Sequence, residues 1–590
     1  MGCNGIFRIM FLALIPLVLL SVGWFAHDPV TLFASTVLLV GALAGVLLSR
    51  RGAWKRNWIG LLPFAVVIGY LISAVVNGQG LASLYLGGYQ RNFGVATWLA
   101  LAIVFLIGAQ GEVKVRGYLD WVLPGVLVAG LGYGLVQFLD KDPLPWTNPY
   151  NAVSLTLGNP NFAGAFFGIL SVLAFSRIFA GKGVIQKSFG VVLFAATVFI
   201  SLKTNSLQSP LLIVAGIVIF TLFANFGSKS GLGRVAKISS GGVLGAAVVG
   251  VVALFAGSGS LLATAREKLF FQGSVAQRLD YWRTGFEIWK DNPIFGVGTD
   301  QFQRYAALYR TPEQVKRDGV FVIPDKSHNV LIDHFANGGL IVGLIWVAFV
   351  ISVFYMLVKA LRINDSIQLR RDLALLGTMW STYVLQALIS PDQIVLSLIG
   401  YSSAGLIAGI YLIDAPTVKI DPFIVRAVTL VALIFTVVIS GTALKVNADA
   451  KKVLAGQIIG VEPVLEVIDA WPNAKTTELI GIQEINKPNN CEFANQISDQ
   501  LLKYDDRSAQ GWYMKAICNN SARNFTQAVA DITNSVKFDP INPTYLVGKA
   551  KLEIAAARIS DAKVTIAKIT EVDPTNPELP ALNTSVLALN

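Results

Sequence analysis

Charge is scarce in this chain of 590 residues: Asp, Glu, Lys and Arg make up only 14% of it, whereas hydrophobic residues make up 54%. A soluble domain carries about 25% charged residues, which cover its surface. This shortage excludes a water-soluble globular protein over most of the length. We therefore expect a polytopic membrane protein whose partner is the lipid bilayer.

Histidine and cysteine are also rare, with three residues of each. The sequence contains no metal-ligand cluster, no Walker-type phosphate loop and no nucleophile elbow, so we expect neither a metal nor a cofactor. The net charge is +11, which in a soluble protein would suggest nucleic acid. Because Lys and Arg collect at the cytoplasmic ends of membrane helices, we expect no nucleic-acid partner.

About thirteen hydrophobic segments fill the first three-quarters of the chain, most of them close to the ~20 residues that cross a bilayer. They cover residues 6–24, 30–48, 58–76, 94–107, 118–138, 162–180, 189–202, 210–226, 243–255, 340–358, 374–388, 394–413 and 423–443. The first has no small-residue cleavage site after it, so we interpret it as an uncleaved span and not a signal peptide.

The loops between these segments share their positive charge unevenly. One set of alternate loops holds sixteen Lys and Arg residues, whereas the other holds only Arg91, Lys141 and Lys203. Cytoplasmic loops are the ones enriched in Lys and Arg, so the N-terminus is expected in the cytoplasm. Thirteen spans then place the C-terminal tail on the exported side, and twelve would place it inside.

This pattern predicts four regions. Residues 1–256 are N-terminal transmembrane helices, 257–339 a large exported loop, 340–444 further transmembrane helices, and 445–590 a soluble tail. Aromatic residues at near-helical spacing, such as Tyr281, Trp282 and Trp289, indicate that the loop is folded.

The tail repeats with a period of 34 residues. Asp505, Asp539 and Asp573 stand in register, and Trp471 falls one period earlier. A 34-residue period of paired helices resembles the tetratricopeptide repeat, whose surfaces bind peptides or protein partners. The predicted fold class is therefore all-α: a membrane helix bundle of about thirteen spans with a C-terminal tetratricopeptide-like α-solenoid.

Two cysteines, Cys491 and Cys518, lie in this tail. On the exported side they could form a disulfide across neighbouring helices. Two buried thiols are the alternative, and the sequence leaves both open.

The large loop holds residue types suited to group transfer. His328 lies shortly before the span that begins at residue 340, and a histidine at a membrane–water boundary can act as a base near neutral pH. Arg278 lies upstream, and its planar guanidinium suits a lipid pyrophosphate. A structural histidine, and an arginine that reaches lipid headgroups or pairs with Asp280, are the alternatives. We expect His27 to be inert at the interface and assign His334 no role.

The order of these motifs resembles the O-antigen ligase and polymerase superfamily. The resemblance rests on Arg278 with Trp282, Asn292-Pro293, Gly296-Val297-Gly298, Ser327-His328-Asn329, Gly338 and Gly343. Residues 88–94 and 158–163, which open the fourth and sixth spans, are similar to further family motifs. The resemblance covers roughly residues 60–410, and several members of the family carry tetratricopeptide tails.

The resemblance implies a metal-independent glycosyltransferase on the outer face of the cytoplasmic membrane. Such enzymes transfer a glycan from an undecaprenyl-pyrophosphate carrier to an acceptor hydroxyl. His328 matches the family histidine and is implied to be the general base or to orient the acceptor. Arg278 matches an arginine that holds the pyrophosphate, and Arg91 is expected to do the same from the opposite wall.

One segment departs from the family pattern. Many relatives begin the eighth span with a Ser-Arg-Gly motif whose arginine faces the site, but residues 203–210 contain no arginine. Lys203 and Gln208 are the expected substitutes. Asn329 is expected to fix the imidazole, and Asn159 and Asn161 to cap a helix and line the cavity.

Several reactions remain open within the family: ligation to a lipid or wall acceptor, polymerisation of repeat units, and transfer to protein hydroxyls. An exported repeat tail favours a macromolecular acceptor or a protein partner. A polysaccharide transporter or flippase is the alternative of a different class. It would require ionisable residues near span midpoints and inverted repeats, and the predicted spans are nearly free of charge. A membrane-anchored scaffold in which only the repeats function would need one span, so about thirteen expected spans argue against it.

Overall fold

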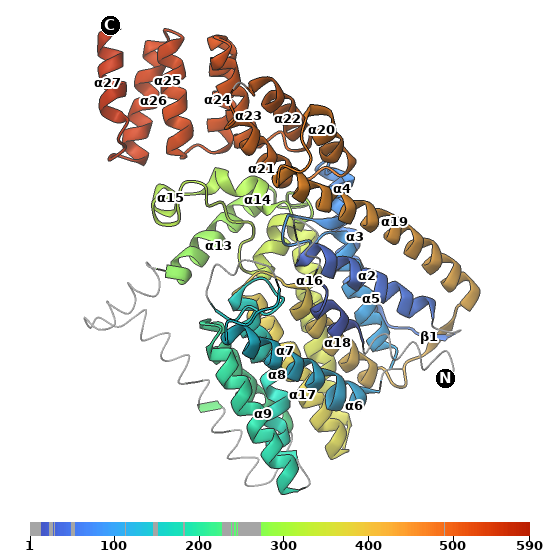
Figure 1. Cartoon of the computed structure of the whole chain (residues 1–590). Coiled ribbons are helices and arrows are strands. Elements are labelled where there is room, and N and C mark those ends of the chain that lie inside the picture. Colours follow the sequence, from blue (N-terminus) through green and yellow to red (C-terminus); the bar gives the residue numbers. More distant parts are fainter. Residues whose placement is uncertain are drawn as a thin grey trace.

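The computed structural model describes residues 13–22, 28, 30–48, 53–111, 114–144, 152–180, 183–226, 273–488 and 490–589, with a few single positions between 238 and 245. Within them a bundle of long apolar helices is followed by a row of shorter helices (Figure 1). The all-α class and the polytopic bundle are therefore confirmed.

Long helices make up the bundle. They are α2 (Thr31–Leu47), η1 with α3 (Trp58–Leu61, Leu62–Val76), α5 (Val95–Ala109), η2 with α7 (Tyr118–Val122, Leu123–Phe138), α8 (Pro160–Ala180), α9 (Val184–Leu202), α10 (Gln208–Ala224), α16 (Val330–Ile363), α17 (Ile367–Ala387), α18 (Ile394–Tyr411) and α19 (Pro422–Leu454). Seven described helical segments are long and apolar enough to cross a membrane, and α2, α5 and α10 are shorter apolar helices. The expected spans at 6–24 and 243–255 lie partly or wholly outside the described residues, so the count of thirteen stays a prediction.

Glycines let two helices of the bundle approach each other closely. A Cβ added to Gly108 of α5 would lie 2.8 Å from the carbonyl carbon of Gly405 in α18. Small residues at such crossings are typical of membrane helix pairs, where close backbone contact replaces the hydrophobic effect. The bundle also buries large side chains, among them Trp380 and Tyr401.

A two-stranded sheet ties together two of the basic loops. β1 (Ala53–Lys55) pairs antiparallel with β2 (Thr417–Lys419), and Trp54 lies opposite Val418. Lys55 and Lys419 both belong to the set of loops rich in Lys and Arg, and the sheet places these two loops next to each other. The tail follows the other end of α19, a helix of 33 residues that begins just after β2.

The loop before α16 is folded, as its aromatic spacing indicates. From residue 273 onward it forms α13 (Gly273–Asp291), α14 (Phe302–Ala306), η4 (Ala307–Tyr309) and α15 (Pro312–Asp318). Short helices α4 (Leu81–Leu86) and α6 (Val115–Gly117) lie in other connections.

Helix α16 is broken at Gly339, whose φ of 67° lies in the left-handed region. The residues after α13 fill the break: Leu340 N donates to Pro293 O at 2.8 Å, and Val297 N donates to Ala336 O at 3.1 Å. A side chain on Gly339 would collide with the Ile294 carbonyl group. The Asn-Pro and Gly-Val-Gly motifs therefore lock the loop into the kinked helix, and the expected span at 340–358 starts at this kink.

The tail contains eight described helices, and each of them from the second onward packs against the next. They are α20 (Val461–Ala470), α21 (Ala474–Ile485), α22 (Cys491–Tyr504), α23 (Ala509–Ser521), α24 (Phe525–Phe538), α25 (Pro543–Ala555), α26 (Ile559–Val572) and α27 (Leu579–Ala588). Trp471, Asp505, Asp539 and Asp573 directly follow α20, α22, α24 and α26, with φ between −151° and −141° and ψ between 77° and 90°. The 34-residue period is thus a structural repeat, and its assignment as tetratricopeptide stays a prediction.

The tail docks on the loop through two of its in-register aspartates. Arg304 Nε donates to Asp505 at 2.5 Å, and Arg310 Nη2 lies 2.6 Å from the Asp539 carboxylate. The third aspartate, Asp573, bonds within the tail. The tail and the large loop therefore lie on the same side of the bundle (Figure 1).

The tail cysteines are free thiols in this structure. Burial raises the pKa of Cys518, and a hydrogen bond with Cys491 raises it further. The two thiols therefore contact each other across α22 and α23, and a disulfide between them stays a prediction for the oxidised protein.

Candidate active site

His328 lies in a tight turn at the start of α16. Its φ of 58° is left-handed, which is uncommon for a residue with a side chain. Neighbouring bonds hold the turn: Ser327 N donates to Asp333 Oδ1 at 2.8 Å, and Asn329 Oδ1 accepts from Ile332 N at 3.2 Å. Asn329 thus supports the histidine by capping α16.

The imidazole of His328 lies against Tyr281 of α13, with ring centroids 5.1 Å apart. Its Nδ1 lies 3.3 Å from the carbonyl oxygen of Lys326. In the tautomer with a proton on Nδ1, this nitrogen donates to that carbonyl and leaves Nε2 as an acceptor. The carbonyl rather than Asn329 therefore orients the ring.

Burial lowers the pKa of His328 to about 4; the carboxylate of Asp325 opposes this shift, and the guanidinium groups of Arg91 and Arg278 add to it. The imidazole is therefore neutral at pH 7 and free to accept a proton. The same interactions show that both expected arginines lie within electrostatic reach of the histidine.

Arg91 is anchored by an acidic partner far away in the sequence. Its Nε donates to Asp325 Oδ2 at 2.6 Å. Burial alone would raise the pKa of Asp325, but Arg91 holds it below its ordinary value. This bond to Asp325 uses the Nε atom of the guanidinium. Its guanidinium also lies 5.7 Å from the ring of Phe162, at the start of α8.

Arg278 on α13 has few partners. Its Nη1 lies 3.4 Å from Ser274 Oγ, and its buried Nε bonds to no described residue. Asp280 instead pairs with Arg317 at 2.8 Å and lies 3.9 Å from Arg283. The expected alternative, an ion pair between Arg278 and Asp280, is therefore not formed in this structure.

A buried ion pair between Lys326 and Asp300 joins the segments around the histidine. Burial alone would lower the pKa of Lys326, but Asp300 and Asp333 raise it above its ordinary value. Asp300 Oδ2 also accepts from Gly88 N at 2.6 Å. One carboxylate thus fixes the loop that carries Arg91 relative to the loop that carries His328.

The asparagines at the start of α8 lie beside the segment that departs from the family pattern. Asn159 Oδ1 accepts from Asn161 N at 2.8 Å, as expected of a cap, and Asn161 Oδ1 accepts from Ser206 Oγ at 2.8 Å. Gln208 is buried, and its side-chain amide bonds to no described group. The ammonium of Lys203 lies elsewhere, 4.7 Å from the ring of Phe138.

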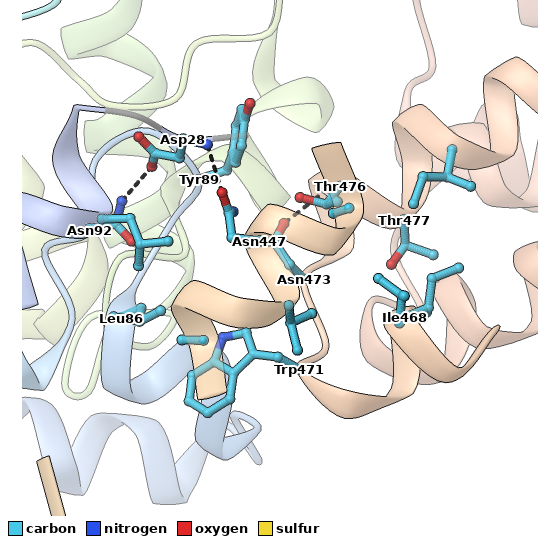
Figure 2. A pocket seen from close by; sticks show the side chains of 16 residues that line it. Asp28, Leu86, Tyr89, Asn92, Asn447, Ile468, Trp471, Asn473, Thr476 and Thr477 are labelled. Atoms are coloured by element: carbon cyan, nitrogen blue, oxygen red, sulfur yellow. Dashed lines mark hydrogen bonds between the residues drawn. The ribbon is translucent and has the colours of Figure 1, made fainter. Parts of the chain in front are cut away.

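A small cavity of about 30 Å³ lies where the loop that carries Arg91 meets the tail (Figure 2). Such a volume holds about one water molecule. Asp28 joins its walls: its carboxylate accepts from Asn92 Nδ2 at 2.6 Å, and its backbone N donates to Asn447 Oδ1 at 2.8 Å. We interpret this region as a joint that fixes the Arg91 loop against α19.

His334 is buried inside the bundle, away from the turn. Its Nδ1 lies 2.8 Å from Tyr70 Oη, and its ring lies against Trp98 and Trp346 at centroid distances of 5.0 and 5.1 Å. These contacts fit a packing role. His27 lies outside the described residues.

The sequence did not single out three acidic or basic residues of this site: Asp325, Lys326 and Asp300. Asp325 and Lys326 directly precede the Ser-His-Asn motif, which was the one available signal. Asp325 and Asp300 bond to residues far away in the sequence: Arg91 is 234 residues from Asp325, and Gly88 is 212 residues from Asp300.

The arrangement can support group transfer to a hydroxyl. A neutral imidazole can remove a proton, and fixed guanidinium groups can stabilise a negatively charged leaving group.

Comparison with protein families matches residues 162–347 to the family described as O-Antigen ligase. The match contains Arg278 and His328 and ends in α16, so it does not include the tail. Comparison with the curated proteins finds no match. Residues 162–347, which carry both His328 and Arg278, are therefore similar to the O-antigen ligase family.

Proposed function

We propose that the protein transfers a glycan from an undecaprenyl-pyrophosphate carrier to an acceptor hydroxyl on the outer face of the cytoplasmic membrane. The observation that carries the proposal is a neutral His328 within electrostatic reach of Arg91 and Arg278, at the end of a membrane bundle. The acceptor would be part of a lipid, the cell wall or a protein.

In the proposed reaction, Nε2 of His328 removes the proton from the acceptor hydroxyl as its oxygen attacks the anomeric carbon of the donor. The bond from that carbon to the pyrophosphate oxygen breaks, and the new glycosidic bond forms. Undecaprenyl pyrophosphate leaves as an anion, and the proton passes from the imidazolium to solvent or to this anion. Fixed positive charge lowers the barrier because it acts where negative charge develops.

Arg91 and Arg278 would supply that charge in place of a metal ion. We propose Gln208 as the additional pyrophosphate contact, because its buried amide has no partner among the described residues. It is a better candidate than Lys203, whose ammonium packs over an aromatic ring. Asn161 would help shape this wall through Ser206.

A ligase is the proposed reaction, and polymerisation of repeat units or transfer to protein are outcomes that the product distinguishes. The test is transfer from a labelled undecaprenyl-pyrophosphate glycan by the purified protein in liposomes. We expect His328→Ala to lose about 10² to 10⁴ in rate, as is typical for removal of a general base. A single product indicates a ligase, and a ladder indicates a polymerase.

Arg278→Ala is expected to lose transfer as well, and Arg283→Ala provides a control on the same helix. Arg283 is half-exposed and donates to the Tyr309 carbonyl oxygen. Transfer that is unchanged in both His328→Ala and Arg278→Ala would refute the mechanism.

A further inference from the structure

A large cavity of about 1260 Å³ opens between the bundle and the tail. Its walls come from three parts of the chain: residues 77–91, residues 300–325 of the large loop, and residues 470–545 of the tail. Pockets for small molecules typically measure ~300–1,000 Å³. This cavity therefore suits an extended ligand better than a single small one.

The cavity reaches the candidate active site. Arg91 and Asp325, which bond to each other at 2.6 Å, are both part of its wall. These two residues act electrostatically on His328. A ligand bound along the cavity would thus place one end beside the groups that perform the transfer.

The charges of the cavity wall balance. It contains five cationic and five anionic side chains, and several of them neutralise one another, such as Arg304 with Asp505 and Lys475 with Glu478. A polyanion or a strongly basic peptide would find no net attraction here. The wall instead favours a neutral ligand.

The aromatic residues of the wall supply flat apolar surfaces. Phe321 is 63% exposed although it lies in this concave site, and its ring meets Tyr545 edge-on at 6.3 Å. Trp471 and Tyr504 line the same cavity, so Phe321 belongs to a group of aromatic side chains and is not a single exposed residue. Gln303 and Ser508 lie in the same wall and offer amide and hydroxyl groups. Aromatic faces beside such groups suit a sugar chain, whose C–H faces are apolar and whose edges carry hydroxyls.

We propose that this cavity binds the acceptor and that the acceptor is a neutral oligosaccharide chain, held between the large loop and the repeat tail. The end that receives the new sugar lies at Arg91 and Asp325. The tail is then part of the substrate site and not only a surface for protein partners. This proposal rests on the proposed function for the identity of the reaction, and the binding itself is measurable without it.

The test is equilibrium binding to the full chain in lipid nanodiscs, without any donor. The probes are oligosaccharides of several units released from the surface glycan of the producing cells, a Ser/Thr-rich synthetic peptide, and polyphosphate. We expect the oligosaccharide alone to bind. Phe321→Ala should weaken binding about tenfold, as truncation of an aromatic anchor does, and Phe321→Trp should retain it.

Val564→Ala is the matched control, because Val564 is 71% exposed on the tail and outside the cavity. Thermal unfolding of each variant shows whether the fold is intact. Preference for the peptide or polyphosphate, or oligosaccharide binding that Phe321→Ala and Val564→Ala affect equally, would overturn the proposal. Binding without any glycan transfer would instead leave the cavity assignment standing and refute the proposed function.

Discussion

The ion pair between Arg310 and Asp539 offers a sharp test of how the tail is held. Both side chains are fully buried, with 0% and 1% exposed. Arg310 Nη2 donates to both carboxylate oxygens at 2.7 and 2.6 Å, and Nη1 donates to the Val320 carbonyl oxygen at 2.7 Å. Removing one partner of such a pair leaves a buried charge without compensation, which costs about 3–5 kcal/mol.

Asp539→Asn should therefore loosen the contact between loop and tail by this amount. The matched control is Asp573→Asn, which changes the equivalent position of the next repeat, where the aspartate bonds only within the tail. Hydrogen exchange of the amides in residues 300–325 measures the effect. We expect protection there to fall by about two orders of magnitude or more in Asp539→Asn, since 1.4 kcal/mol corresponds to tenfold, and to stay unchanged in Asp573→Asn.

The double variant Arg310→Met with Asp539→Leu should recover most of the protection, because a well-packed apolar pair often equals a buried ion pair. Equal protection of residues 300–325 in wild type and in Asp539→Asn would refute the reasoning. It would show that other contacts hold the loop against the tail.

Three further predictions concern the site and its surroundings. The kcat/KM profile should have its acid limb at about pH 4, because burial lowers the pKa of His328 to about 4 from its ordinary value of 6.5. The unfolded chain takes up this proton at a higher pH than the folded protein, so the free energy of unfolding should also fall as the pH drops from 6.5 toward 4. An acid limb at pH 6.5 would contradict the lowered pKa on which these two predictions rest. Gly339→Ala should lower the Tm and the transfer rate, because its φ of 67° is strained for alanine and the methyl group would meet Ile294; an unchanged Tm would be inconsistent with this kink. Cys491 and Cys518 should resist alkylation until a reductant is added if the tail is exported, and immediate labelling of the unfolded protein would argue against a disulfide.

The membrane helices could be predicted from the sequence because lipid imposes one simple requirement, a long apolar run. The segments at 58–76 and 394–413 match helical segments of the structure closely. The predicted start of one helix was wrong, because α16 extends beyond its apolar run into the large loop. The segment 340–358 was expected alone, but α16 begins at Val330, since a left-handed Gly339 joins it to a helix that belongs to the loop.

The candidate site was only partly predictable. The Ser-His-Asn motif is local, so His328 could be identified, whereas the Arg91–Asp325 pair joins residues from two distant loops and leaves no local pattern. Arg278 could be identified from its motif, but its surroundings could not. The sequence allowed an ion pair between Arg278 and Asp280, whereas in the structure Asp280 pairs with Arg317. The tail's period was readable because each repeat ends its helix in the same way.

Helix α19 has a consequence for how the two halves of the protein are aligned. It runs without interruption from Pro422 to Leu454, 33 residues, or about 50 Å at 1.5 Å per residue. The hydrocarbon core of a bilayer takes up ~30 Å, so the last turns stand clear of it, and Val453 near their end packs against Val464 of α20. This continuous helix therefore fixes the orientation of the tail relative to the bundle. Inserting one residue into α19 would rotate the tail by ~100° about the helix axis and carry its aspartates away from the loop arginines. The length of α19 therefore decides whether the tail and the loop can enclose the large cavity.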